Sequence, residues 1–208
     1  MLVMRFRAAA RRLREDAGGL ALVEFAFSLP IVLTLGLVGL ETAHYALAHL
    51  RVSNIAMMTA DNASRVRDSI DESDVNELML GSILTGETIG FEPNGRIVLS
   101  SIELNAAENG QWIRWQRCAG SKNAASRYGA QGAGRTDASI QGMGPAGNRI
   151  AAQPGTAVLV AEVFYDYQPI VPNTISGGTT ISYVSAFNVR QRNDQAIRNA
   201  ASVTVSSC

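Results

Sequence analysis

The feature that most constrains this chain is one long apolar segment near its N-terminus. The 21 residues from Leu20 to Leu40 contain a single charged side chain, that of Glu24. As an α-helix the segment would be about 31 Å long, which matches the hydrocarbon thickness of a bilayer. A carboxylate at that depth costs roughly 2.5–3.5 kcal/mol on insertion scales, so Glu24 is a candidate functional residue. The sequence therefore predicts a membrane-spanning helix whose one charge needs a partner that the helix itself does not supply.

The residues that flank this segment set its orientation. Residues 1–19 carry five arginines against two acidic residues, which leaves a net charge of +3. This excess predicts that residues 1–19 stay in the cytoplasm and that the chain after about residue 48 lies across the membrane. A cleaved secretory signal is an alternative, with Ala46-Leu47-Ala48 as its small-residue cleavage site. The apolar core of such a signal is usually about 7–15 residues, shorter than the one here.

The residues around Gly19 resemble a known processing signal. A basic leader that ends in Gly, followed by an apolar helix with Glu24 at its fifth position and Phe25 at its sixth, is similar to the type IV pilin signal. A longer match resembles the TadE-like pseudopilins of the tight-adherence (Tad/Flp) pilus, and it comprises Leu22-Val23-Glu24-Phe25-Ala26-Phe27-Ser28-Leu29-Pro30 and Gly39-Leu40-Glu41. Residues 163–169 and 187–190 are similar to sheet segments of TadE- and TadG-like proteins. The resemblance is strong over residues 15–67.

The resemblance implies a processing site, a set of partners and a location. It implies that a prepilin peptidase cuts between Gly19 and Leu20. The other partners it implies are the major Flp pilin, a second minor pilin, the pilus platform of the bacterial inner membrane, and the lipid of that membrane. The N-terminus would be cytoplasmic and the head periplasmic, with entry into an extracellular pilus open. The alternative is an uncleaved, signal-anchored periplasmic domain that acts as a binding module or scaffold.

The chemistry of Glu24 agrees with this resemblance. Cleavage after Gly19 would create a positive α-amine on Leu20 at the membrane boundary. Glu24, with Phe25 beside it, could meet that amine in its own chain or in a neighbouring subunit, which lowers the cost of both charges and sets the axial register. The alternative is a plain anchor whose Glu24 reaches the cytoplasmic interface one turn away.

Pro30 lies ten residues after Leu20 within the same predicted helix. Its ring removes a backbone N–H and clashes with the carbonyl of Ala26, so a kink is expected there. The hydroxyl of Ser28, or a neighbouring helix, could bond the carbonyl that Pro30 leaves free. A kink would suit a subunit that leaves the bilayer, but structural tolerance explains Pro30 equally well.

The remaining pattern predicts an α+β fold of pilin type, in which a helix packs on one sheet. The expected divisions are a leader at 1–19, a transmembrane helix at 20–48, a helical stem with a second helix at 49–95, and a β-rich head at 96–208. The first helix would run on to near Arg67, and its amphipathic outer half would pack through Ala56, Met57, Ala60 and Ala63. Asp74 and Glu77 resemble a capping box for the short second helix, which closes near Gly86.

Strand patterns after Gly95 predict a mostly antiparallel sheet of four or five strands. The expected strands are 96–104, 112–116, 156–167, 181–189 and 202–206. Residues 119–155 form a long Gly-rich loop, interpreted either as a subunit-contact surface or as simple disorder. Its Gly142–Gly147 stretch matches GxGxxG, but a dinucleotide site needs a strand before it and a helix at its third glycine. We therefore reject nucleotide binding.

The few chemistry-bearing residues argue against catalysis. Cys118 and Cys208 are the only cysteines, and an oxidising periplasm favours a disulfide between them, with two free buried thiols as the alternative. A structural zinc site needs four ligands, and His44 and His49 point to different sides of a helix. No nucleophile motif is present, so no enzyme activity, metal or cofactor is expected. The zero net charge, with no basic patch outside the leader, argues against a nucleic-acid partner.

Overall fold

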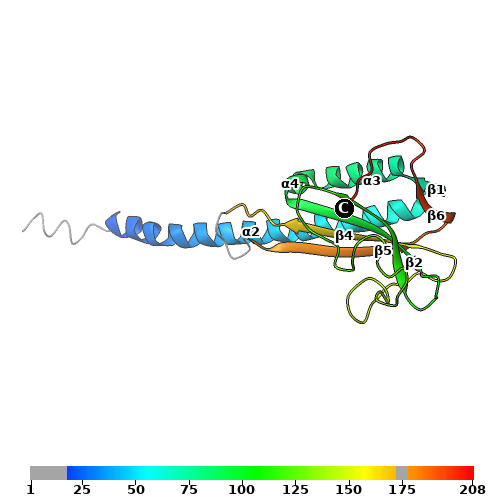
Figure 1. The fold of residues 1–208 in the computed structure, drawn as a ribbon. Helices are drawn as coiled ribbons and strands as arrows, with labels where there is room; N and C mark the ends of the chain where they lie inside the picture. The colour runs from blue at the N-terminus through cyan, green and yellow to red at the C-terminus, as the bar shows by residue number, and fades with distance from the viewer. Residues whose placement is uncertain (1–17, 172–177) are drawn as a thin grey trace, which may run out of the picture. The chain divides into compact units, whose positions relative to one another are not determined.

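The structure is a computed structural model that describes residues 18–171 and 178–208. Most of the predicted basic leader, residues 1–17, lies outside the described residues. The chain divides into two compact units between His44 and Tyr45. We call the described part of the first the anchor segment (Gly18–His44) and the second the head (Tyr45–Cys208). The elements in chain order are α2 (Gly18–Arg65), β1 (Asp68–Asp71), α3 (Glu72–Thr85), the 3-10 helix η1 (Glu87–Ile89), α4 (Phe91–Asn94), β2 (Gly95–Leu104), β3 (Gln111–Ala119), β4 (Val158–Asp166), β5 (Thr180–Asn188) and β6 (Arg192–Arg198) (Figure 1).

The anchor segment is an exposed apolar helix. Among the described residues, α2 is the one helix that is long and apolar enough, by length and composition, to cross a membrane. Its most apolar stretch has no residue buried against the rest of the chain. Apolar surface left in water is unfavourable by roughly 25 cal/mol per Å², so this stretch requires lipid or another apolar partner.

The head confirms the predicted α+β class. Its main sheet has four antiparallel strands in the order β3-β2-β4-β5. The four strands lie where the sequence places them, with ends that differ by one or two residues except at β3, which continues three residues further to Ala119. One apolar cluster joins α2 and α3 to the first face of the sheet, through residues such as Val52, Met79 and Leu159. The sheet therefore has its helices on one face.

The part of α2 within the head packs through small side chains. Ala48, Val52, Ala56, Ala60 and Ala63 are buried, and they follow one face of the helix. Small side chains let the helix lie close to the strands. The sequence placed Met57 on this face as well, which is wrong: its side chain is 43% exposed. A step of 100° per residue from Ala56 carries Met57 away from the sheet.

The second helix has the predicted end but a different start. Gly86 is the C-cap of α3, as expected. The capping box, however, is formed by Asp71 and Asp74, not by Asp74 and Glu77. The Asp71 carboxylate accepts the Ser73 N–H at 3.1 Å, and Asp74 accepts the Asp71 N–H at 2.9 Å. Aspartate at the third helical position is not the usual capping-box residue, which is why the sequence pattern favours Asp74 with Glu77 instead.

The strand predicted at residues 202–206 is absent. The extra pairing is instead a two-stranded parallel sheet of β1 and β6. β6 escapes pattern analysis because polar residues dominate its sequence, RNDQAIR. Ser202 has a positive φ of 53°, which interrupts an extended segment. The residues after it are held by isolated bonds, from the Asn76 amide to the Thr204 carbonyl (2.9 Å) and from the Cys118 N–H to the Ser206 carbonyl (2.8 Å).

The long loop is folded rather than disordered. Met143, Ile140 and Ala152 are buried against Ile113 and Val158, and so they cover the second face of the sheet. At Gly134, which has φ +76°, a Cβ atom would lie 2.1 Å from the carbonyl oxygen of Gln111, so only glycine fits this approach. The GxGxxG glycines all have positive φ and surround the isolated bridge between Met143 and Ile150. The motif is thus a turn of the loop, with no helix after it.

Candidate functional site

The residues of the predicted processing and pairing site lie together on the first turns of α2. The helix begins at Gly18, and Leu20 and Phe25 have exposed fractions of 63% and 60%. Leu20 and Glu24 are four residues apart, so their Cβ atoms lie about 5–6 Å from each other on one side of the helix. An amine created at Leu20 would therefore stand one turn from the Glu24 carboxylate.

Gly19 has no packing role in the described chain. A Cβ atom built on it would meet nothing within 4 Å, and the same holds for Gly36 and Gly39 further along the helix. Its lack of a side chain is therefore not explained by contacts within the described residues.

The helix passes through Pro30 without interruption. The Ser28 hydroxyl donates to the carbonyl of Phe25 at 3.2 Å and not to that of Ala26, and the Thr34 hydroxyl donates to the carbonyl of Pro30 at 2.7 Å. Local hydroxyls therefore bond the backbone on both sides of the proline, as happens in membrane helices. The kink at Pro30 stays a prediction.

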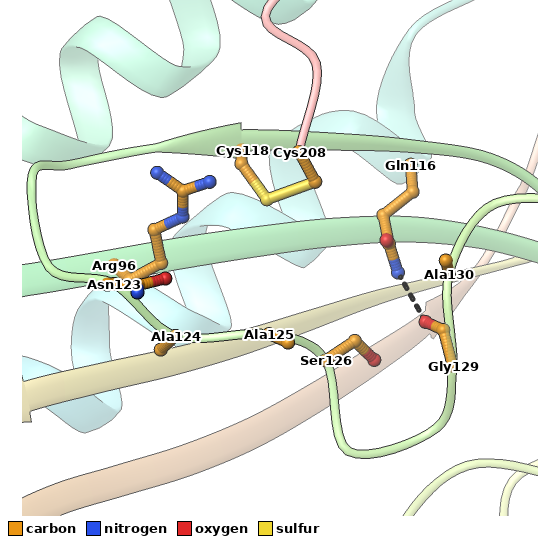
Figure 2. Close-up of a pocket in the computed structure, with 10 residues that line it drawn as sticks. All are labelled: Arg96, Gln116, Cys118, Asn123, Ala124, Ala125, Ser126, Gly129, Ala130 and Cys208. Carbon is orange, nitrogen blue, oxygen red and sulfur yellow. Dashed lines mark hydrogen bonds between the residues drawn. A yellow bond between two sulfur atoms is a disulfide. The ribbon is translucent and has the colours of Figure 1, made fainter.

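A disulfide joins Cys118 of β3 to Cys208, with Cα atoms 5.0 Å apart. It lies beside a pocket of about 320 Å³ on the second face of the sheet (Figure 2). In that pocket the buried Gln116 amide donates to the carbonyl of Gly129 at 3.1 Å and to the hydroxyl of Ser100 at 2.9 Å. The residues that line it are Arg96, Gln116, Cys118, Asn123, Ala124, Ala125, Ser126, Gly129, Ala130 and Cys208. This lining has one cation and no acid or histidine, so it offers no acid–base pair.

The histidines do not form a metal site. In residues 18–171 and 178–208, no group of three or more His, Cys, Asp or Glu side chains could hold a metal ion. His49 is half-buried, and its Nδ1 lies 3.0 Å from the Tyr183 hydroxyl. Its ring also lies edge-on to that of Tyr45, with centroids 4.6 Å apart. His49 is thus part of an aromatic contact between α2 and β5.

Among the buried charged side chains, two sites were not singled out from the sequence, an ion pair and a single glutamate. Glu72 and Arg117 form an ion pair whose side chains are 3% and 8% exposed. The pair joins the first turn of α3 to β3, and its members are 45 residues apart, so no spacing pattern could reveal it. The other is Glu162, the one charged residue in the interior of the apolar strand VLVAEVFYD, and a charge at such a position is a visible signal of a special environment. Its carboxylate accepts the hydroxyl of Ser126 and the N–H of Arg127.

Glu162 should make the stability of the head depend on pH. Burial raises the pKa of the Glu162 carboxyl above its usual value, although the bonds from Ser126 and Arg127 oppose the shift. A raised pKa means that the folded state binds the proton more tightly than the unfolded state. The contribution of protonated Glu162 to the free energy of unfolding is therefore present at low pH and is lost as pH rises through the folded pKa. Relative to wild type, Glu162→Gln should gain stability as pH rises from 4 to 7, by at most about 1.4 kcal/mol per pH unit.

Urea unfolding of full-length wild type and Glu162→Gln in detergent, at several pH values, measures this difference in the free energy of unfolding. Glu77→Gln is the matched control, because Glu77 is an exposed glutamate on α3. A difference between Glu162→Gln and wild type that stays flat over this pH range would contradict the assignment.

Comparison with known protein families found a match that lies within the exposed helix α2. Residues 19–61 match the family model described as TadE-like protein. The N-terminal helix is TadE-like. The match begins at Gly19, the first residue of the predicted cut, and runs into the head part of α2. Searches of curated proteins and of solved structures found no match to the chain.

The family relation bears on the kind of function. TadE-like proteins are Tad pilus-related pilins, which are structural rather than catalytic. A single N-terminal apolar helix fits a membrane-anchored protein of this kind.

Proposed function

We propose that this chain is a minor pilin, or pseudopilin, that takes part in assembly of a Tad (Flp) pilus. A prepilin peptidase cuts it after Gly19, and the mature chain assembles through its hydrophobic N-terminal helix. The observation that carries the proposal is the TadE-like match over residues 19–61, which coincides with a helix whose apolar side chains are exposed from Leu20 onward. Such a surface fits a protein that exchanges lipid for the helices of other subunits.

Three features of the first turns support processing and pairing. Gly19 lies at a position where no internal contact requires glycine. Leu20 stands one helical turn before Glu24, so the new amine and the carboxylate are within reach of each other. Glu24 has no ion-pair partner in the described parts of the chain. An amine from its own processed terminus, or from a neighbouring subunit, would supply that partner. The pairing would lower the free-energy cost of holding both charges in a medium of low dielectric constant.

The proposal includes specific partners and a place in the cell. The partners are the prepilin peptidase, the inner-membrane platform, the major Flp pilin and a second minor pilin. Before assembly the chain spans the inner membrane once, with its N-terminus in the cytoplasm and its head in the periplasm. The excess of arginine in residues 1–19 supports this orientation.

Intact mass and N-terminal sequence of the protein from membranes of its native host test the cut. A chain that begins at Leu20 supports the proposal. One that begins at Met1 favours a fixed, uncleaved anchor, and one that begins near Leu47 or His49 indicates an ordinary secreted domain. Gly19→Leu should abolish processing, whereas Gly39→Leu should not, since both glycines are equally free of contacts within the described residues. Mature protein of wild-type size from Gly19→Leu would refute the site.

Glu24→Ala should leave cleavage largely intact but reduce pilus output by about tenfold or more, since an interaction of about 1.4 kcal/mol in each subunit contact is lost. Glu24→Gln should behave in the same way, because it keeps the size and removes the charge. Ser28→Ala is the control, since the Ser28 hydroxyl bonds only its own helix, at the Phe25 carbonyl. Filaments counted by electron microscopy provide the readout, and normal piliation of Glu24→Ala would remove the pairing argument.

A further inference from the structure

The pocket beside the disulfide has the size of a site for a small ligand. Its volume is about 320 Å³, and it lies between the main sheet and the loop that follows β3. Figure 2 shows the disulfide on one side of it, and Ala124 and Ala125 on the other. Arg96 of β2 is the one charged residue in the lining. Ligand pockets of proteins have volumes of about 300–1,000 Å³, mostly apolar walls and a few placed polar groups.

The guanidinium of Arg96 is positioned by the backbone but has no anion. Its Nη1 donates to the Gly120 carbonyl at 3.0 Å. Gly120 has φ +94°, and a Cβ atom there would lie 2.3 Å from the carbonyl oxygen of Gly95, so only glycine allows this approach of loop and strand. None of the ion pairs in residues 18–171 and 178–208 includes Arg96. The charge is therefore held in place without being neutralised.

The other two nitrogens of Arg96 have no acceptor in the described chain. Nε is buried and makes no hydrogen bond, so part of the guanidinium is removed from water. Nη2 makes no hydrogen bond to a described residue either, and it is not buried in the way that Nε is. A carboxylate that reaches Nη2 would gain a charge-assisted hydrogen bond. Partial burial of the cation makes this attraction stronger than at a fully exposed arginine.

Hydrogen bonds hold the walls of the pocket in place. At one end, Gln116 is 5% exposed and donates from its side-chain amide to the Gly129 carbonyl at 3.1 Å, and its backbone N–H donates to Oε1 of Gln131 at 3.1 Å. At the other end, the Lys122 N–H donates to the Gly95 carbonyl at 3.1 Å. The loop is thus tied to β2 and β3 on both sides of the pocket. Walls that are already fixed lower the ordering cost of binding.

The acids around the pocket already have partners. The lining contains no aspartate or glutamate. The carboxylate of Glu162 accepts the Ser126 hydroxyl and the Arg127 N–H. The carboxylate of Asp166 pairs with the Lys122 ammonium, next to the lining residue Asn123. A carboxylate that neutralises Arg96 therefore has to come from outside the described chain.

We propose that this pocket binds a carboxylate carried on a short apolar stem. The carboxylate pairs with Arg96, and the stem lies between the disulfide and the side chains of Ala124 and Ala125, which offer it no hydrogen bonds. A small organic acid and the acidic side chain of a partner protein share this chemistry. The inference goes beyond the proposed function, because it concerns the head alone and does not depend on a cut after Gly19 or on Glu24.

Propionate is the probe, and NMR of the full chain in detergent micelles, with ¹³C-labelled alanine methyl groups, is the measurement. The signals of Ala124 and Ala130 should shift and saturate, with a Kd of about 1 mM. Propionamide has the same size without the charge, and it should bind about tenfold more weakly or worse. Equal affinities for the two compounds, or no saturation by about 50 mM propionate, would overturn the proposal.

Three variants separate the pocket from other sites. Arg96→Gln should weaken propionate binding about tenfold or more, because it removes the charge. Arg149→Gln is the matched control, since Arg149 is an exposed arginine of the same loop outside the lining, and binding should stay as in wild type. Ala125→Leu keeps the charge but fills the pocket, so it should abolish binding even if Arg96→Gln does not fold. An intact disulfide and an unchanged Tm show that a variant is folded.

A peptide with blocked ends, acetyl-Ala-Glu-Ala-amide, distinguishes the two sources of the carboxylate. Tighter binding of this peptide than of propionate would assign the pocket to the acidic side chain of a partner. Tighter binding of propionate would assign it to a small organic acid, and both results support a carboxylate site. Shifts that persist in Ala125→Leu with either probe would place the binding elsewhere and refute the proposal. A chain that begins at Met1 but binds propionate in this pocket would refute the proposed function and leave this inference in place.

Discussion

Replacing both Cys118 and Cys208 with serine should lower the free energy of unfolding of the head by about 4–5 kcal/mol. The disulfide closes a loop with a sequence separation of 90 residues, which contains β4, β5 and β6. In the chain-entropy model this cross-link removes conformational freedom from the unfolded state, and the effect increases with the logarithm of loop length. Chemical unfolding of the full chain in detergent micelles measures the difference between oxidised wild type and the double variant.

The wild-type protein treated with a thiol reductant should match the serine variant. The residues that lose order first should be those held next to the disulfide, where the Asn76 side-chain amide donates to the Thr204 carbonyl and the Ser206 hydroxyl donates to Oδ1 of Asn76. A loss of less than about 1 kcal/mol would show that the loop is already restricted in the unfolded chain.

Glu72→Ala should destabilise the head by about 3–5 kcal/mol, because it leaves the Arg117 guanidinium buried without its counter-ion. In the native head Arg117 donates from Nε and Nη2 to the Glu72 carboxylate, and from Nη1 to the Gln116 carbonyl (2.7 Å) and the Gln131 side chain (2.9 Å). Neither neutral acceptor replaces a carboxylate. Urea unfolding of the full chain provides the measurement.

The double variant Glu72→Leu with Arg117→Met should lose less stability than Glu72→Ala alone, since it removes both charges and fills their volume. Arg198→Ala is the surface control, because the Arg198–Asp194 pair is largely exposed, and its loss should change stability by about 0.5 kcal/mol or less. If Glu72→Ala costs no more than Arg198→Ala, the buried pair is not a main support of the α3–β3 contact.

The sequence predicted those parts of the fold that follow from local pattern. The apolar run from Leu20 predicted the anchor helix, and the strand patterns after Gly95 predicted the four main strands. The errors fall where polar side chains or non-local contacts decide the structure. β6 is polar and pairs with a strand more than 100 residues earlier, and the start of α3 depends on which of several acids bonds the Asp71 N–H.

The candidate sites divide in the same way. Gly19, Glu24 and Phe25 could be found because they lie within one short motif. The Glu72–Arg117 pair and the position of β5 at the end of the strand order could not, since each depends on which elements become neighbours in the fold. The strand order makes β5 an edge strand. The residue pattern of a single strand does not predict the order of the strands in a sheet.

The long loop that covers β3 has a consequence for the size of any complex. A sheet with two open margins can be extended by each new copy, which is the route to fibrils. Here Gly132, Ala133 and Ser206 occupy one margin with backbone of the same chain. Growth by strand addition is therefore blocked at the β3 margin, so a complex of this head cannot extend from both margins of the sheet.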